Sequence, residues 1–162
     1  MVTGTVTLND VRRTVADIAD PELPVVSIGE LGILRDVTLD GDRAVVTITP
    51  TYSGCPAMDT IRYDIRHRLV DLGVSDVDIR VALAPAWTTD WISVSGKAKL
   101  AAAGIAPPGR RDHGPVPVAL AVRCPRCGSP ETVELSRFSA TACTALWRCR
   151  ACGEPFDRVK EH

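Results

Sequence analysis

The chain has 162 residues, 45% of them hydrophobic and 24% charged, which is enough to bury the core of one ordinary domain or of a modest domain plus a small one. Its formal net charge of −1 argues against a role that depends on bulk attraction to nucleic acid or to an anionic membrane. The first residues have no charged start followed by an apolar run, and no stretch is long enough to span a bilayer. We therefore expect a cytoplasmic protein with no nucleic-acid partner and no membrane partner.

The spacing of apolar residues predicts an α+β domain in the first two thirds of the chain. The expected elements, in chain order, are a helix over 7–19, strands over 33–39 and 43–49, a helix over 55–72, a strand over 77–84 and a helix from about 90 to 103. The turn signal Asp40-Gly41-Asp42 predicts that the first two strands form a hairpin. The third strand follows a helical crossover, which allows parallel pairing, so we expect a small mixed sheet.

Local signals support the helix ends. Thr7 can cap the first helix, with Asp10 three residues later, and Asp20-Pro21 would end it. Pro56 suits the first position of the second helix, and Gly73 would terminate that helix.

Composition divides the chain into three parts. We expect a domain over 1–105, a linker over 106–117 that is rich in proline and glycine, and a small C-terminal domain over 118–162. In the last part we expect short strands at Thr132–Leu135 and Ala145–Trp147.

Four of the six cysteines form two pairs in this C-terminal part. The pairs are Cys124-Pro-Arg-Cys127 and Cys149-Arg-Ala-Cys152, each followed by glycine and separated by about twenty residues. This spacing predicts a zinc ribbon in which four thiolates surround one metal ion. Iron in a rubredoxin-like site or an Fe–S cluster is the alternative, because sulfur ligands do not distinguish these metals. We expect a structural site, since four thiolates leave zinc no open position for substrate.

Cys143 lies between the two pairs, and two interpretations of it stay open. It is a small buried apolar residue of the ribbon, or a fifth thiol near the metal that can exchange ligands or react.

Cys55 stands apart from the other cysteines, at the expected start of the second helix. The positive end of a helix lowers the pKa of a thiol, so we expect a lowered pKa for Cys55. The residues alone leave three roles open: a nucleophile, a metal or cluster ligand, or an inert capping residue. Asp20 and Glu22 are candidate partners, although a helix stop and a surface charge would also explain them. No histidine is placed to act as a base in hydrolysis.

Three segments resemble the metal–sulfur cluster assembly domain of SufT-like proteins. They are Asp20-Pro21-Glu22-Leu23-Pro24, Ile28-Gly29-Glu30-Leu31-Gly32-Ile33 and Thr51-Tyr52-Ser53-Gly54-Cys55-Pro56. Segments 85–92, 141–149 and 152–157 are similar to the PaaD (PaaJ) type of this family in particular. Tyr52 departs from the wider family, which often has a second threonine there. Thr144 departs from the PaaD type, in which lysine is common.

The resemblance implies an Fe–S cluster assembly fold with a C-terminal zinc ribbon, and a maturation role rather than the epoxidation itself. PaaD-type proteins are encoded with the subunits of phenylacetyl-CoA epoxidase, a multicomponent oxygenase of aerobic phenylacetate degradation. Transferred residue by residue, the site that the family implies comprises Asp20, Glu22, Leu23, Thr51 and Cys55. Cys55 would be a transient ligand for iron or an Fe–S cluster.

The implied partners are the oxygenase and Fe–S reductase subunits of that epoxidase, together with the Fe–S assembly machinery. The centre that is assembled or repaired would be an Fe–S cluster or a di-iron site. Two other functions stay open: an iron-binding redox or electron-transfer component, and a purely structural subunit of the oxygenase. The oligomeric state is also open, with a homodimer as one alternative.

Overall fold

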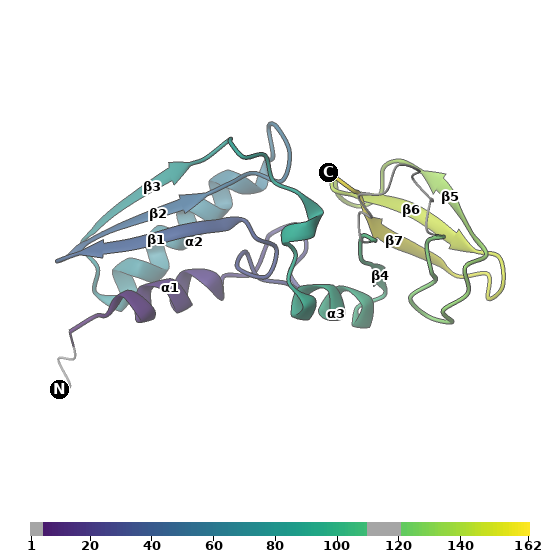
Figure 1. Ribbon diagram of the computed structural model, residues 1–162, viewed down its shortest axis with the longest axis horizontal. Coiled ribbons are helices and arrows are strands. Elements are labelled where there is room, and N and C mark those ends of the chain that lie inside the picture. Colours follow the sequence, from purple (N-terminus) through teal and green to yellow (C-terminus); the bar gives the residue numbers. More distant parts are fainter. Residues whose placement is uncertain (1–4, 110–120) are drawn as a thin grey trace. The chain divides into compact units, whose positions relative to one another are not determined.

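The computed structural model describes residues 5–109 and 121–162. Contacts within the chain divide it into two compact units, Met1–Trp87 and Thr88–His162. Figure 1 shows the elements of both units, and each unit is described by itself below.

The first unit is an α+β domain built on a mixed sheet. Its elements are α1 (Leu8–Ala16), β1 (Leu34–Asp40), β2 (Arg43–Ile48), α2 (Ala57–Leu72) and β3 (Asp76–Val81). β2 lies between the other two strands, antiparallel to β1 and parallel to β3. The parallel pair is joined through α2, as Figure 1 shows, and the expected hairpin and crossover are confirmed.

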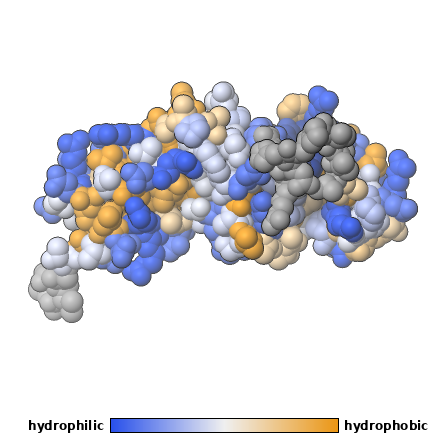
Figure 2. Space-filling model, viewed as in Figure 1, coloured by the Kyte–Doolittle hydropathy of each residue, from blue (hydrophilic) through white to orange (hydrophobic). Residues whose placement is uncertain are grey.

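Periodic apolar side chains form the core of this unit. Val11 and Val15 lie four residues apart on α1, and the buried positions of β2 alternate with more exposed ones. The fully buried members of the core include Val11, Val15, Val37, Ala44, Val46, Ile48, Ile61, Ile65 and Leu69. Each large aliphatic side chain contributes about 1.5–3 kcal/mol by leaving water. Figure 2 shows hydrophobic residues at the surface of the first unit bordered by hydrophilic ones.

The helix ends follow the local signals of the sequence. The side chain of Thr7 accepts the backbone N–H of Asp10, and the side chain of Asp10 accepts that of Thr7, which completes a capping box. Gly73 ends α2 in the left-handed region at φ 103°. The first helix ends earlier than predicted, at Ala16 with Asp17 as its C-cap.

Gly29 permits a close approach between two segments of the first unit. Its N–H donates to the carbonyl of Ala16 at 3.1 Å. A Cβ at this position would lie 2.8 Å from the same carbonyl oxygen and 2.9 Å from the Ala16 Cβ. The segment that follows α1 is therefore held against the end of that helix.

The second unit combines a short helical segment with a four-stranded sheet. Its elements are η1 (Thr89–Trp91), a 3₁₀ turn, then α3 (Val94–Ala102), β4 (Ile105–Ala106), β5 (Thr132–Ser136), β6 (Thr144–Cys149) and β7 (Pro155–Val159). The strand order is β4-β7-β6-β5, with β4 parallel to β7 and the other pairs antiparallel.

Two elements of this unit differ from the prediction. We expected one helix from about 90 to 103, but the backbone of Ile92 is extended, and α3 begins separately at Val94. The side chain of Ser93 accepts the N–H of Gly96 at 3.0 Å and caps this second start. The strand β7 was not predicted at all.

The predicted boundaries of the domains remain predictions. Ala106, which we placed at the start of the linker, is buried in β4 and paired with Arg158 of β7. Residues 110–117 of the predicted linker lie outside the described residues. Within the described parts of the chain, no helix combines the length and the apolar character that crossing a membrane requires.

Candidate metal centre and thiol site

The two cysteine pairs form matching turns at the ends of the ribbon strands. After the first pair, the N–H of Gly128 donates to the carbonyl of Cys124 at 2.9 Å. After the second, the N–H of Gly153 donates to that of Cys149 at 3.0 Å. Both glycines are left-handed, at φ 73° and 79°. The glycine after each pair therefore serves the tight turn that the sequence predicted.

The four sulfur atoms converge on one point. Those of Cys124 and Cys152 lie 3.8 Å apart, those of Cys127 and Cys149 lie 3.6 Å apart, and all four are within 4.8 Å of one another. A disulfide would require about 2.05 Å. Ligands about 2.3 Å from a tetrahedral zinc ion lie about 3.8 Å from each other, so the four thiols fit such an ion.

The electrostatics of the cluster also favour a cation. The backbone N–H groups of Cys152 and then Ala151 lower the pKa of Cys149 to about 7. The N–H of Ser129 acts to lower the pKa of Cys127, but the nearby sulfurs and desolvation together raise that pKa to about 12 overall. Cys149 therefore ionises readily, and its negative charge then opposes ionisation of Cys127. A bound divalent cation would remove this conflict, because it stabilises all four thiolates together.

The apolar core around these ligands is small. It comprises Ala106, Cys124, Cys149 and Phe156, with Val122 and Trp147 packed against it. Two of the four buried members are themselves metal ligands, so the ligands contribute both the metal site and much of the core.

Cys143 is not part of the cysteine cluster. It precedes β6, whereas Cys149 is the last residue of that strand, and six residues of extended chain span roughly 20 Å. Cys143 is 7% exposed and its sulfur lies 3.1 Å from the hydroxyl oxygen of Thr141. The position supports the interpretation of Cys143 as a buried residue of the ribbon and opposes that of a fifth thiol beside the metal.

Cys55 lies just before α2, in the first unit. The helix begins at Ala57 with Pro56 as its N-cap, and the carbonyl of Cys55 accepts the N–H of Met58 at 3.3 Å. The thiol is half-buried. The N–H of Ala57, the first residue of the helix, acts on the thiol, so Cys55 occupies a position at the helix N-terminus, as predicted.

The direction of the Cys55 pKa differs from the prediction. Burial raises the pKa of this thiol. The N–H of Ala57 lowers it by less, the negative charge of Glu22 raises it further, and hydrogen bonds with Tyr52 and Thr51 lower it slightly. The expectation of a lowered pKa was wrong because desolvation and a carboxylate outweigh the end of the helix. Cys55 is therefore a neutral thiol at pH 7.

Tyr52 is a residue of this site that the sequence did not assign. Its hydroxyl lies 3.5 Å from the Glu22 carboxylate, a long contact, and it also interacts with the Cys55 thiol. The structure thus brings together Glu22, Thr51, Tyr52 and Cys55. The feature of the sequence that could have identified it is the tyrosine itself, at a position where the wider family often has threonine.

Asp20 adjoins this cluster through the backbone. It is 5% exposed, and its Oδ1 accepts the N–H groups of Glu22 at 3.0 Å and Leu23 at 2.7 Å. Burial raises the pKa of Asp20, and these two hydrogen bonds act against that shift. Asp20 therefore fixes the turn that presents Glu22.

The fold and the two sites define a class of protein, an iron–sulfur cluster assembly domain followed by a zinc ribbon. Residues 8–83 match the model of the iron–sulfur cluster assembly protein family, and residues 110–160 match that of the PaaD zinc beta ribbon domain. The chain is 43% identical over 154 residues to an Escherichia coli K12 protein named as a subunit of 1,2-phenylacetyl-CoA epoxidase. That alignment covers 94% of this chain and 92% of the relative. The chain belongs to the PaaD family.

Two further relatives each match a little over half of the chain. An Fe–S protein maturation auxiliary factor of Porphyromonas gingivalis W83 is 36% identical over 89 residues, which is 54% of this chain and 84% of the relative. A crystal structure of a DUF59 domain from Bacillus anthracis is 32% identical, with a TM-score of 0.54, over 57% of this chain and 90% of that domain. These matches confirm the predicted α+β fold of this region.

Proposed function

We propose that this chain is an accessory protein of a phenylacetyl-CoA epoxidase, and that it assists assembly or repair of an Fe–S or di-iron centre of that oxygenase. Cys55 is the residue that handles iron or a cluster transiently. The epoxidase is named for the Escherichia coli relative, and maturation of Fe–S proteins for the Porphyromonas gingivalis relative. The proposal transfers both to this chain.

The observation that carries the proposal is the group of side chains around Cys55. A thiol that is not tied into the four-cysteine cluster lies beside the Glu22 carboxylate and the hydroxyls of Tyr52 and Thr51. A thiolate and a carboxylate are both ligands of iron in proteins. Because Cys55 is neutral, iron would displace a proton when it binds, and reprotonation would favour its release. This is what a transient carrier requires.

The ribbon has a separate role in this proposal. Its four thiols fill the coordination sphere of one zinc ion and hold a domain that has little apolar core of its own. We infer that it acts as a docking module for the oxygenase or its Fe–S reductase subunit. The Fe–S assembly machinery would be a further partner.

The test compares Cys55→Ser with Cys143→Ser, each co-expressed with the Fe–S reductase subunit of the epoxidase. Cys143, like Cys55, is not in a disulfide, but it lies outside the cysteine cluster and in the other unit, so its variant controls for loss of a thiol. We expect lower cluster occupancy and lower epoxidase activity with the Cys55 variant only. Unchanged occupancy with Cys55→Ser would exclude Cys55 as the carrier.

Metal analysis of the purified wild-type chain separates the alternatives. Stoichiometric zinc and no visible absorbance agree with the proposal. Stoichiometric iron in the ribbon with visible absorbance would indicate a redox or electron-transfer component instead. Stable co-purification with the oxygenase, together with full tolerance of Cys55→Ser, would indicate a structural subunit.

A further inference from the structure

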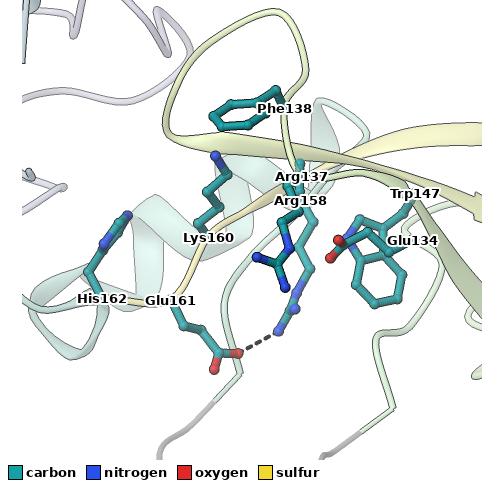
Figure 3. Close-up of a pocket in the computed structure, with 9 residues that line it drawn as sticks. Glu134, Arg137, Phe138, Trp147, Arg158, Lys160, Glu161 and His162 are labelled. Atoms are coloured by element: carbon teal, nitrogen blue, oxygen red, sulfur yellow. Dashed lines mark hydrogen bonds and ion pairs between the residues drawn. The ribbon is translucent and has the colours of Figure 1, made fainter.

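The second unit contains a pocket of about 340 Å³ that the metal centre does not use. Figure 3 shows the side chains around it, from β5, β6, β7, the turn after β5 and the last residues of the chain. Two of these residues argue for a ligand: Arg137 and Phe138. The volume lies at the lower end of the range for small-molecule sites and would hold one large side chain with part of its backbone.

The walls of the pocket combine aromatic rings with cations. The Lys160 ammonium lies 4.3 Å from the centre of the Phe138 ring, and the Arg158 guanidinium lies 5.4 Å from that of Trp147. The Phe138 ring lies at the edge of the pocket, in a residue that is 70% exposed. A phenylalanine presented in this way is an anchor on which an apolar group of a partner can be buried.

One cation of the pocket is left for a ligand. Arg158 forms an ion pair with Glu161, which Figure 3 marks, and the Lys160 ammonium donates to the carbonyl of Ala142 at 2.8 Å. Arg137 has no hydrogen bond or ion pair with any residue that the structure describes. Among the residues that line the pocket, three arginines and lysines stand against two glutamates, so the lining favours an anionic group.

We propose that this pocket binds an acidic segment of a partner polypeptide. One carboxylate of the segment pairs with the Arg137 guanidinium, and an adjacent apolar side chain covers Phe138. A single carboxylate fits better than a polyanion, because Glu134 and Glu161 also line the pocket and would repel further negative charge. A free small anion would leave Phe138 exposed, whereas a peptide covers it.

This inference rests on the docking role that the proposed function gives to the ribbon. It does not involve Cys55 or iron, so the two can fail separately.

The experiment measures binding of two short peptides to the full zinc-loaded chain by fluorescence anisotropy. Both are acetylated and amidated, and they differ only in the central sequence, Leu-Glu-Phe or Leu-Gln-Phe. We expect the acidic peptide to bind more tightly by about three- to tenfold, the range of a charge-assisted contact at a partly exposed site. Arg137→Gln should abolish the difference. Arg66→Gln, which removes the same charge from an exposed position on α2, should preserve it.

An NMR titration locates the bound peptide. The indole N–H signal of Trp147, assigned with Trp147→Phe, should shift with the acidic peptide. Equal affinity for the two peptides, no binding of either up to millimolar concentration, or full binding by Arg137→Gln would overturn the proposal. If inorganic phosphate shifts the same signals and displaces the peptide at a similar concentration, the pocket is a site for small oxyanions and the peptide proposal is again overturned.

Discussion

Replacing Asp20 separates a structural role of this carboxylate from a functional one. Its Oδ1 accepts two backbone N–H groups, from Glu22 and Leu23, and the Leu23 bond is buried. Asp20→Ala leaves both donors without a partner. A buried donor that loses its partner costs about 1–3 kcal/mol, and the Glu22 N–H can regain water more easily, so we expect a loss of about 2–4 kcal/mol.

Asp20→Asn is the matched variant, because its side-chain oxygen can accept the same two bonds. Burial raises the pKa of Asp20 in the folded chain, so the folded state holds the proton more tightly than the unfolded state does. For wild type, the free energy of unfolding therefore falls as pH rises from the ordinary pKa of aspartate through the raised one. Asparagine has no such titration. At pH 7 we expect Asp20→Asn to be at least as stable as wild type.

Urea unfolding of the full chain, followed by circular dichroism at pH 7 and at pH 4, measures all three proteins. The advantage of Asp20→Asn over wild type should shrink at pH 4. If Asp20→Ala loses less than about 0.5 kcal/mol, or Asp20→Asn loses as much as Asp20→Ala, the two hydrogen bonds do not stabilise the turn as argued. If Asp20→Asn folds normally but no longer supports cluster assembly in the co-expressed reductase, the charge of Asp20 has a function beyond the turn.

Three further changes to the protein test individual features of the structure. Gly29→Ala places a Cβ 2.8 Å from the carbonyl oxygen of Ala16. We expect this clash to lower the free energy of unfolding, measured in urea, by about 1–3 kcal/mol. A variant as stable as wild type would show that the backbone shifts to accommodate the Cβ without loss of stability. Removing the metal with a chelator should collapse the NMR dispersion of residues 121–162 and spare that of 5–87, and a dispersed ribbon spectrum without metal would refute a metal-dependent fold. Glu22→Gln removes a negative charge that raises the pKa of Cys55, so Cys55 should be alkylated faster at pH 7.5 by mass spectrometry; an unchanged or slower rate would contradict this.

The fold was predictable where local signals and core periodicity agree. Thr7 with Asp10, the turn around Gly41 and the left-handed Gly73 each determine a boundary through a few neighbouring residues. The start of α3 was missed because Thr88 and Ser93 are both suitable caps. Thr88 caps only the 3₁₀ turn, and the extended Ile92 then separates it from the helix. Strand β7 was missed because its backbone is organised by pairing with β6, which no local pattern shows.

The metal centre was predictable, whereas the electrostatics of Cys55 were not. Paired cysteines followed by glycine specify a turn and a ligand set within a few residues. The pKa of Cys55 depends on burial and on Glu22, which is 33 residues earlier in the chain. The sequence shows the helix end, which lowers the pKa of Cys55, because that feature is local. It does not show the burial of the thiol, which raises the pKa by more. The contact between Tyr52 and Glu22 was missed for the same reason.

The four ribbon cysteines and Cys55 differ in whether their surroundings favour the thiolate or the protonated thiol, and this difference bears on the proposed function. Around the ribbon sulfurs, backbone N–H groups of Ser129, Ala151, Cys152 and Glu154 all act to lower thiol pKa values, so the polypeptide itself favours bound metal. Around Cys55, burial and a carboxylate favour the protonated thiol, and one N–H group opposes them. A bound cation would relieve the mutual repulsion of the ribbon thiolates, whereas iron at Cys55, as proposed, would compete with a proton that the protein itself favours. A permanent site and a carrier that must release its cargo have these opposite requirements, and under the proposed function the ribbon and Cys55 would meet them in separate units.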